Sequence, residues 1–430
     1  MSQALWDNLF NLCAVALWTL LLFYFFLVIG GIIYFRKNSK AAPSQPLREY
    51  PMVSVIVPAH NEAMVIRKTI ETLLNFDYPQ NRYEIIVIND NSSDNSAEIL
   101  SKIQQEHPGR NLTVIHTDST NGGKGKSNAL NLAMGYVSGS LISIYDADNT
   151  PEPDALRLLA DALMADDQLS AAVGMFRTRN KNASLLTRCI NIETLSTQCT
   201  NHAGRCQFFK LGMLTGTNYM IRRSVIEALG GWETDSITED TELSYRMHSR
   251  GYRIQYIPRA VSWQQEPQDL KIWFKQRARW VRGNFQVFTR YFHCLFDSRS
   301  KQLRFEILQY MLMIFITTVV CGLCNIVSLL SLFGVLQLTT PLATIWNWIA
   351  ISIIFVSVMY LGTIHASKET NWGNLFASVL MIGYSFLWYP LIFYSICQSI
   401  RRRITGQTAK WDKTVRFEEK NQDSRKETPV

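Results

Sequence analysis

The sequence has 430 residues, more than one typical domain, of which 47% are hydrophobic and 18% charged. The apolar residues gather at the two ends, and basic runs beside them produce the net charge of +8, for which anionic membrane lipid is the simplest partner. No nucleic-acid partner is expected, because no recognised binding motif accompanies the charge.

The first apolar segment, residues 5–35, contains a single charged side chain, Asp7. A helix needs roughly twenty apolar residues to cross the hydrocarbon core of a bilayer. The segment is too long for a signal-peptide core and has no small-residue cleavage site, so we expect a retained transmembrane helix. Arg36, Lys37 and Lys40 follow it and place the next domain in the cytoplasm.

The middle of the chain alternates between predicted strands and helices. Strands are expected at residues 53–57, 84–88, 112–116 and 141–145, with helices at 65–74, 96–106 and 126–135. This alternation is typical of βαβ units and a parallel sheet with both faces covered. Ligands of such sheets bind beyond the carboxyl ends of the strands, so the loops at that edge are the candidate site.

Three of those loops are polar. Asp146 and Asp148 follow the fourth strand on an extended segment, so both carboxylates can point the same way. Hard oxygen ligands at this place suit Mg²⁺ or Mn²⁺ bridging a diphosphate. Asp90, after the second strand, can accept hydrogen bonds from a base or ribose, although a capped turn explains its segment equally well. The loop after the first strand carries Pro58, His60 and Glu62.

Two further polar segments have both a structural and a chemical interpretation. The glycine-rich run before Lys126 is not a P-loop, because Thr120 stands where that motif needs glycine, but Lys126 at a helix start can still hold a phosphate or a uracil carbonyl. Glu239 and Asp240 at a helix start suit the helix dipole, and Asp240 can also be a general base for an acceptor hydroxyl. Gly216, in the loop with Thr217 and Asn218, would let the backbone approach a sugar closely.

Residues 272–296 form a basic and aromatic amphipathic stretch, which predicts a helix on the membrane surface. Within it, Gln276, Arg279 and Trp280 have a second interpretation. Arg279 can hold a diphosphate, and Trp280 can stack on an acceptor sugar.

The C-terminal apolar segments, residues 307–336, 342–361 and 375–400, are each long enough to span a membrane. One span followed by three would place the basic residues from Arg401 onward outside, against the positive-inside rule. Three solutions stay open: residues 307–336 form a helical pair, one segment is re-entrant, or the tail lies outside.

Four features occur in order before the C-terminal membrane helices: Asp90, the Asp-x-Asp at 146–148, Thr238-Glu239-Asp240 and the Gln-x-x-Arg-Trp string at 276–280. Together they resemble the processive members of glycosyltransferase family 2 over residues 51–290. The resemblance implies an α/β, GT-A type (Rossmann-like) cytoplasmic domain inserted between transmembrane helices. The expected division is an N-terminal span and linker (1–47), the catalytic domain (48–267), interfacial helices (268–303), C-terminal spans (304–400) and a basic tail (401–430).

The motifs and the resemblance together assign the site. Asp240 is the expected catalytic base and Asp148 the metal ligand. Nucleotide binding is expected at Pro58, His60, Glu62, Asp90, Lys126, Asp146 and Arg279, and acceptor binding at Gly216, Thr217, Asn218, Glu239, Gln276 and Trp280. The chain departs from the family pattern at Asn89, where an aspartate is common, and at Asn91, which replaces a glycine.

The resemblance implies a plasma-membrane enzyme that uses Mg²⁺ or Mn²⁺ to polymerise UDP-glucose or UDP-N-acetylglucosamine with inversion. It would export the β-linked product through its own helices; an accessory subunit cannot be read from the sequence. Residues 216–223 and 263–267 look closest to bacterial glucan and poly-N-acetylglucosamine synthases. The chain after Arg403 is too short for a cyclic-di-GMP receptor domain of the PilZ type.

Two alternatives remain. One is a non-processive enzyme that adds a single sugar to a lipid, although such enzymes often lack the Gln-x-x-Arg-Trp string. The other is a transporter or channel subunit with an inactive transferase fold, which the intact Asp148, Asp240 and Trp280 disfavour.

Overall fold

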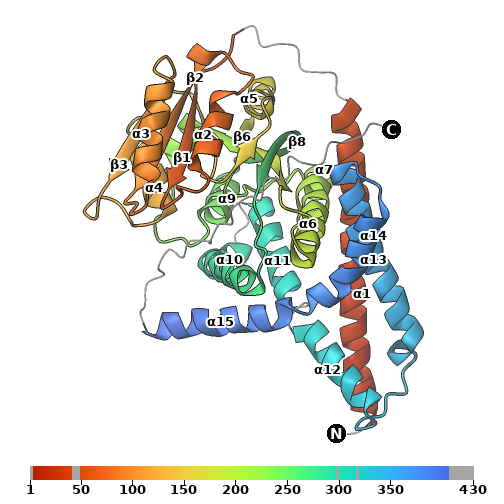
Figure 1. The fold of residues 1–430 in the computed structure, drawn as a ribbon. Coiled ribbons are helices and arrows are strands. Elements are labelled where there is room, and N and C mark those ends of the chain that lie inside the picture. The colour runs from red at the N-terminus through yellow and green to blue at the C-terminus, as the bar shows by residue number, and fades with distance from the viewer. Residues whose placement is uncertain (1–2, 41–48, 297–299, 316–318, 406–430) are drawn as a thin grey trace.

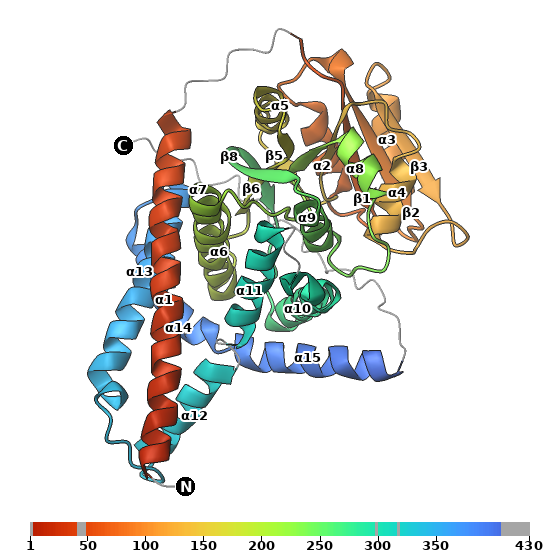
Figure 2. The ribbon, with the colours of Figure 1, turned by 180° about the vertical axis from the view of Figure 1, so that it is seen from behind.

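A computed structural model of the chain describes residues 3–40, 49–296, 300–315 and 319–405. Most of the predicted linker (41–47) and most of the predicted tail (406–430) therefore lie outside the described residues. An α/β domain lies beside one end of the long helix α1 (Gln3–Lys40), and the C-terminal helices extend from the domain along α1 (Figures 1 and 2).

The domain contains one eight-stranded sheet in the order β3-β2-β1-β4-β7-β6-β8-β5. The predicted parallel arrangement is confirmed for β1 to β4, but it is wrong for the whole sheet, because β7 runs antiparallel to both β4 and β6. The strands are β1 (Val53–Ala59), β2 (Tyr83–Asp90), β3 (Leu112–Thr117), β4 (Leu141–Ile144), β5 (Thr150–Pro151), β6 (Leu169–Thr178), β7 (Tyr219–Arg222) and β8 (Arg253–Gln264).

Both faces of the sheet are covered, as predicted, because alternate residues of a strand point to opposite faces. Val55 and Val57 of β1 enter a core shared with α2 (Ile66–Leu74), α3 (Ser96–Glu106) and α5 (Ala155–Ala165). Ile56 enters the opposite core, to which several other helices contribute. Among them are α4 (Lys126–Ala133), α8 (Arg223–Leu229) and α9 (Glu239–Ser249).

Helix α1 packs directly on the domain through the π-helix η2 (Gln198–Gly204), which follows α6 (Leu185–Thr197), and through α7 (Arg205–Phe209). Glycines let the backbones meet: a side chain at Gly31 would collide with Cys199, and one at Gly204 with Leu27. Near the end of α1, the Tyr34 hydroxyl donates to the Tyr256 carbonyl at 2.6 Å. The half of α1 that ends at Lys40 is thus packed into the domain.

Among the described residues, two helices are long and apolar enough to cross a membrane, Gln3–Ser39 and Ile345–Ser367. They correspond to the spans predicted at 5–35 and 342–361. The span predicted at 375–400 is a pair of helices bent by 43°, and the one at 307–336 is divided between two helices, with residues 316–318 outside the described residues. Beyond β8 the elements are α10 (Leu270–Tyr291), η3 (Phe292–Phe296), α11 (Lys301–Phe315), α12 (Cys321–Leu332), η5 (Pro341–Ala343), α13 (Ile345–Ser367), α14 (Trp372–Ser385) and α15 (Trp388–Thr405).

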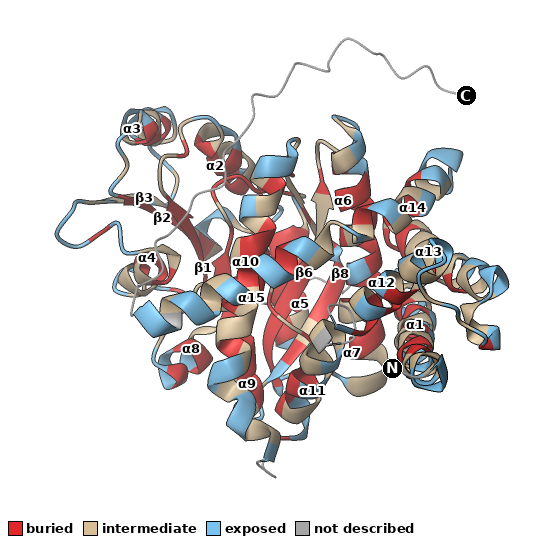
Figure 3. Ribbon diagram, turned by 90° about the horizontal axis from the view of Figure 1, so that it is seen from below, coloured by how far each residue is buried: buried red, intermediate tan, exposed pale blue. Residues whose placement is uncertain are grey.

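Helix α10 does not form an outer surface of the molecule. It lies between the α/β domain and α15, which crosses beneath it (Figure 3). Its buried side chains include Trp273, Ala278, Val281 and Val287. The helix that carries the Gln276 to Trp280 string is therefore held from two sides.

Candidate active site

A cleft of 1470 Å³ opens where the carboxyl ends of β1 and β4 meet the start of α9 and the middle of α10. The last turns of α15 contribute to the wall. Of the site residues predicted from the sequence, those lining the cleft are Pro58, His60, Glu62, Lys126, Asp146, Asp148, Gly216, Thr217, Glu239, Asp240, Gln276, Arg279 and Trp280. Asp90 and Asn218 lie behind this lining.

Asp90 ends β2 and is buried. One of its carboxylate oxygens accepts hydrogen bonds from the Thr117 hydroxyl and the Gly123 N–H, both at 2.8 Å. The other oxygen, Oδ2, has no hydrogen-bond partner among the described residues. His60 Nδ1 lies 2.6 Å from the Asp90 carbonyl oxygen, which joins the loops that follow β1 and β2.

Lys126, the first residue of α4, lies among acceptors from three other segments. Its ammonium is 2.7 Å from Asp146 Oδ1 and 2.9 Å from Glu239 Oε1, and it donates to the Gly216 carbonyl at 2.7 Å. Burial alone would lower the pKa of Lys126, but the two carboxylates raise it above its ordinary value. Lys126 therefore stays charged and ties the end of β4 to the start of α9.

Asp148 lies in the loop after β4 with its side chain buried against the cleft. The Asn149 amide is 3.4 Å from its Oδ1. The loop itself is held by the Asp146 N–H, which donates to the Thr217 hydroxyl at 3.0 Å. Since Asp146 is paired with Lys126, the two carboxylates of the Asp-x-Asp motif have different surroundings.

Asp240 lies in the first turn of α9, and the Thr241 N–H donates to its Oδ1 at 2.8 Å. Gly216 (φ 68°) faces it so closely that an added Cβ would lie 3.2 Å from Asp240 Oδ2. Loss of hydration and the Glu239 carboxylate raise the pKa of Asp240 to about 7, with Lys126 opposing them. A carboxyl group of this pKa can take up a proton near neutral pH.

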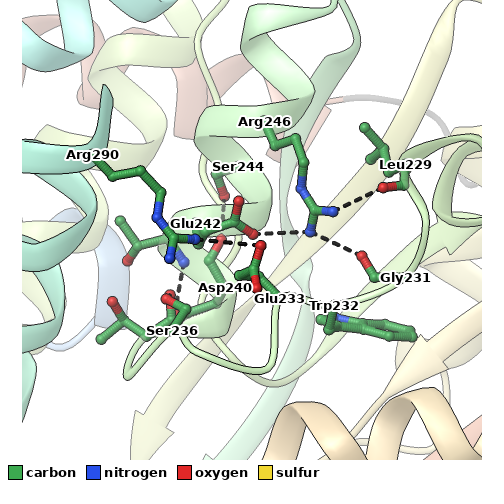
Figure 4. A network of polar contacts seen from close by, with 12 residues as sticks. Leu229, Gly231, Trp232, Glu233, Ser236, Asp240, Glu242, Ser244, Arg246 and Arg290 are labelled. Carbon is green, nitrogen blue, oxygen red and sulfur yellow. Dashed lines mark hydrogen bonds and ion pairs between the residues drawn. The ribbon is translucent and has the colours of Figure 1, made fainter. Parts of the chain in front are cut away.

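A polar network fixes the start of α9 (Figure 4). The Arg246 guanidinium donates to the carbonyls of Leu229 and Gly231 at 2.8 and 2.9 Å, and pairs with the buried Glu242 at 2.9 Å. Glu242 also accepts from the Tyr291 hydroxyl of α10 at 2.7 Å. The helix bearing Asp240 is thus held against both α8 and α10.

The α10 side chains facing the cleft have unused hydrogen-bonding capacity. Arg279 makes no hydrogen bond or ion pair with any described residue, and Gln276 Oε1 is buried without a partner there. The Trp280 ring lies 4.1 Å from the guanidinium of Arg277, measured to the ring centroid. A positive charge and an aromatic face are therefore both available on this wall of the cleft.

Arg277, to which the sequence motif gave no role, turns out to hold Trp280 in place. It is buried and lies 3.1 Å from Glu193 on α6 and 3.8 Å from Glu266 after β8. Tyr384 of α14 donates to Glu193 at 3.0 Å. An arginine between predicted site residues is the one signal in the sequence, since Glu193 lies far away along the chain and only folding brings it to Arg277.

Asn218 has a structural environment in this fold. Its side chain is fully buried, and its amide donates to the carbonyls of Met175 and Ala260, both at 2.9 Å. It thereby bridges β6 and β8 beneath the Gly216 loop.

Comparison with known proteins gives consistent matches. A family model described as "Glycosyltransferase like family 2" matches residues 51–283. The chain is 37% identical over 414 residues to the probable glycosyltransferase YdaM of Bacillus subtilis (strain 168), covering 96% of this chain and 98% of that protein. It is 28% identical to a poly-beta-1,6-N-acetyl-D-glucosamine synthase of Staphylococcus epidermidis, over 86% and 88% of the two chains.

Among solved structures, the mannosyltransferase PcManGT from Pyrobaculum calidifontis, in complex with GDP-Man and Mn²⁺, superimposes with a TM-score of 0.58. The match covers 86% of this chain and 98% of that one at 20% identity, and so it shows a shared fold.

Proposed function

Because the chain belongs to glycosyltransferase family 2, we propose that it is a processive, inverting synthase that polymerises a UDP-hexose into a β-linked polysaccharide. Its catalytic domain has the GT-A type of α/β fold. N-acetylglucosamine is the first sugar to test, since relatives 28% and 32% identical are named for its β-1,6 polymer. The enzyme would reside in the plasma membrane, with its catalytic domain in the cytoplasm, and pass its product between its own helices.

The observation that carries the proposal is the convergence in one cleft of Asp148, Asp240 and Trp280. They come from a strand end, a helix start and the middle of another helix. A carboxylate at a sheet edge, a carboxyl group of raised pKa and an aromatic face supply metal binding, proton transfer and sugar binding in one place.

The donor nucleotide would bind along the loops after β1 and β2. The unpaired Oδ2 of Asp90 is suited to accept a hydrogen bond from uracil, which offers an N–H donor. Arg279, which has no partner among the described residues, would hold the diphosphate, an arrangement that guanidinium geometry favours.

A divalent cation fits the donor set of the cleft. Asp148 offers hard oxygen, while Asp146 is already bound to Lys126. The described residues hold no group of three or more His, Cys, Asp or Glu able to bind a metal alone, so the donor diphosphate would supply further ligands. When bound, Mg²⁺ or Mn²⁺ neutralises charge on the departing UDP.

Asp240 would take the proton of the acceptor hydroxyl. The oxygen then forms a bond to the anomeric carbon as the bond from that carbon to the UDP phosphate breaks. A single displacement of an α-linked donor gives a β-linkage, and Asp240 returns its proton to solvent. The Trp280 ring, held by Arg277, and Gln276 would keep the elongated chain at the cleft for the next addition.

The test is a donor screen of the detergent-purified full chain with Mg²⁺ or Mn²⁺. UDP-N-acetylglucosamine should give a high-mass product that a linkage-specific hydrolase digests, and Asp240→Asn should reduce its formation by about 10²–10⁴-fold. Asp235→Asn, an exposed carboxylate at the cleft rim, is the matched control and should retain activity. A monoglycosylated lipid would contradict processivity, and no turnover with UDP-N-acetylglucosamine or UDP-glucose would contradict the donor class.

A further inference from the structure

Given the membrane location proposed above, helix contacts reveal on which side of the membrane each C-terminal helix ends. The start of α1 marks the side away from the catalytic domain (Figure 1). There Asp7 accepts from the N–H of Thr339 at 2.9 Å and of Thr340 at 3.3 Å. Trp18 donates to Asn347 at 2.9 Å. The connection between α12 and α13 therefore lies at the far side.

Other contacts mark the side of the catalytic domain. The Ser300 hydroxyl, just before α11, donates to the His248 carbonyl of the domain at 2.7 Å. Just after α13, Glu369 pairs with Lys181 of the domain at 2.9 Å. The chain thus crosses outward between Ser300 and Thr339, and returns through α13.

Helices α14 and α15 begin and end at the catalytic domain. The segment leading into α14 is anchored by the Lys181–Glu369 pair. In the last turns of α15, Arg402 and Ile404 line the catalytic cleft, and Gln398 contacts Arg282 of α10. A helix needs roughly twenty residues to cross a hydrocarbon core about 30 Å thick, whereas α14 has 14 residues and α15 has 18. Each helix is too short to cross and return, so a pair whose two ends touch one soluble domain does not cross.

We propose that α14 and α15 do not span the membrane but rest in the leaflet on the catalytic side. One face of α15 packs on α10, while Phe393 is 67% exposed, and Ile400 and Ile404, exposed by 51% and 80%, lie farther along the helix at the rim of the cleft. With Cys397 they recur every three or four residues, which makes one continuous stripe. Helix α14 also leaves Trp372, Phe376 and Val379 exposed.

The occupant of the stripe is lipid rather than another protein. Apolar residues are likewise exposed on α1 and α13, the two helices long enough to span. The exposed Arg401 adds a positive charge at its end, which suits anionic headgroups. Three crossings result, at α1, between Ser300 and Thr339, and at α13. The basic residues from Arg401 onward then lie in the cytoplasm, which satisfies the positive-inside rule.

Added cysteines test the arrangement in a full chain that carries Cys294→Ser and Cys397→Ser, which remove the two cysteines that are not buried. Each is labelled with a membrane-impermeant maleimide in intact cells and in inverted vesicles. Asp167→Cys marks the catalytic side and Gln337→Cys the far side, both at exposed positions. Thr405→Cys, at the end of α15, should label like Asp167→Cys, in inverted vesicles only. Labelling like Gln337→Cys would show that the pair crosses and would overturn the proposal.

The native Cys397 tests the lipid contact. In membranes that hold the Cys294→Ser chain it should resist the maleimide from both sides, and detergent should restore its labelling, because the impermeant reagent does not enter the hydrocarbon. Full labelling in membranes would overturn the lipid contact. Release of the wild-type chain by alkaline carbonate would overturn the membrane location itself. Retention of the chain together with labelling of Thr405→Cys like Gln337→Cys would overturn only the inferred topology.

Discussion

The proposed base is a carboxyl group whose acidity is set by two neighbours of opposite charge. Desolvation and Glu239 raise the pKa of Asp240 to about 7, and Lys126 opposes them. Because only the ionised form accepts a proton, we expect the rate of UDP release to rise as the pH passes through about 7. Glu239→Gln should move the midpoint of this rise to lower pH, and Lys126→Gln to higher pH. Midpoints that move in the same direction would contradict the assignment.

The same group makes folding dependent on pH. The pKa of Asp240 in the folded chain lies above its ordinary value of 3.8, so the folded state holds the proton more tightly. The stability this contributes is present below pH 3.8 and is lost as the pH rises to about 7.

Asp240→Asn should therefore unfold at a higher temperature than the wild type at mildly basic pH, with a smaller difference in acid. Its activity should fall by about 10²–10⁴-fold, the usual contribution of a general base. Thermal unfolding in detergent at two pH values measures the first effect. A variant less stable than the wild type at basic pH would refute the proposed ionisation.

Alanine substitutions at Gly216 and Gly230 distinguish the effect of backbone strain from the effect of contact with the base. Gly216→Ala places a Cβ 3.2 Å from Asp240 Oδ2 at a φ of 68°. Gly230 has a similar φ of 79°, but a Cβ there meets nothing within 4 Å. Both alanine variants should lose about 1–2 kcal/mol of stability through the left-handed backbone, and only Gly216→Ala should lose most of its kcat. Equal activities would show that Gly216 has a purely conformational role.

At the scale of elements, Arg277 and Arg279 lie two residues apart on α10 with different surroundings. Arg277→Met would leave Glu193 and Glu266 without their buried cation, and should cost about 3–5 kcal/mol of stability. It should also raise the KM for the acceptor by loosening Trp280. Arg279→Met breaks no contact with a described residue, so it should lose activity at nearly unchanged stability. Chemical denaturation together with steady-state kinetics would distinguish the two, and a reversed ranking would contradict this division of roles.

The sequence predicts elements well where local pattern decides them. The apolar runs that became β1 to β4 and the periodic stretches that became α2, α3 and α4 lie close to their predicted positions. The antiparallel β7 was not predicted, because its direction is set by its pairing with β4 on one side and β6 on the other, which form only in the folded sheet. Arg277 was missed for the same reason, since Glu193 and Tyr384 approach it only in the folded chain.

At the scale of the whole molecule, α1 is a structural part of the catalytic domain. Gly31→Val would force α1 away from Cys199 and should lower both the unfolding temperature and the activity. Gly383→Val, in a helix where an added Cβ meets nothing within 4 Å, is the control and should change both much less. Loss of activity in the control alone would contradict the inferred coupling.

Apolar length alone could not determine the number of crossings. Residues 375–400 are apolar enough to span, yet the bend between α14 and α15 and the contacts at their two ends are properties of the folded molecule. The cleft was easier to predict: the strand-end carboxylates and the α10 motif were identified in sequence, whereas the burial of Asn218 was not.

The docking of α1 on η2 also imposes an order on biosynthesis. Helix α1 leaves the ribosome first, whereas Cys199 and Gly204 are translated roughly 10–30 s later at ordinary elongation rates. During that interval the face of α1 that carries Gly31 has no domain to pack on. If α1 enters the bilayer as it emerges, the nascent catalytic domain completes its core against a helix already anchored there. The enzyme would then acquire its active site only at the membrane, and no free catalytic domain would accumulate in the cytosol.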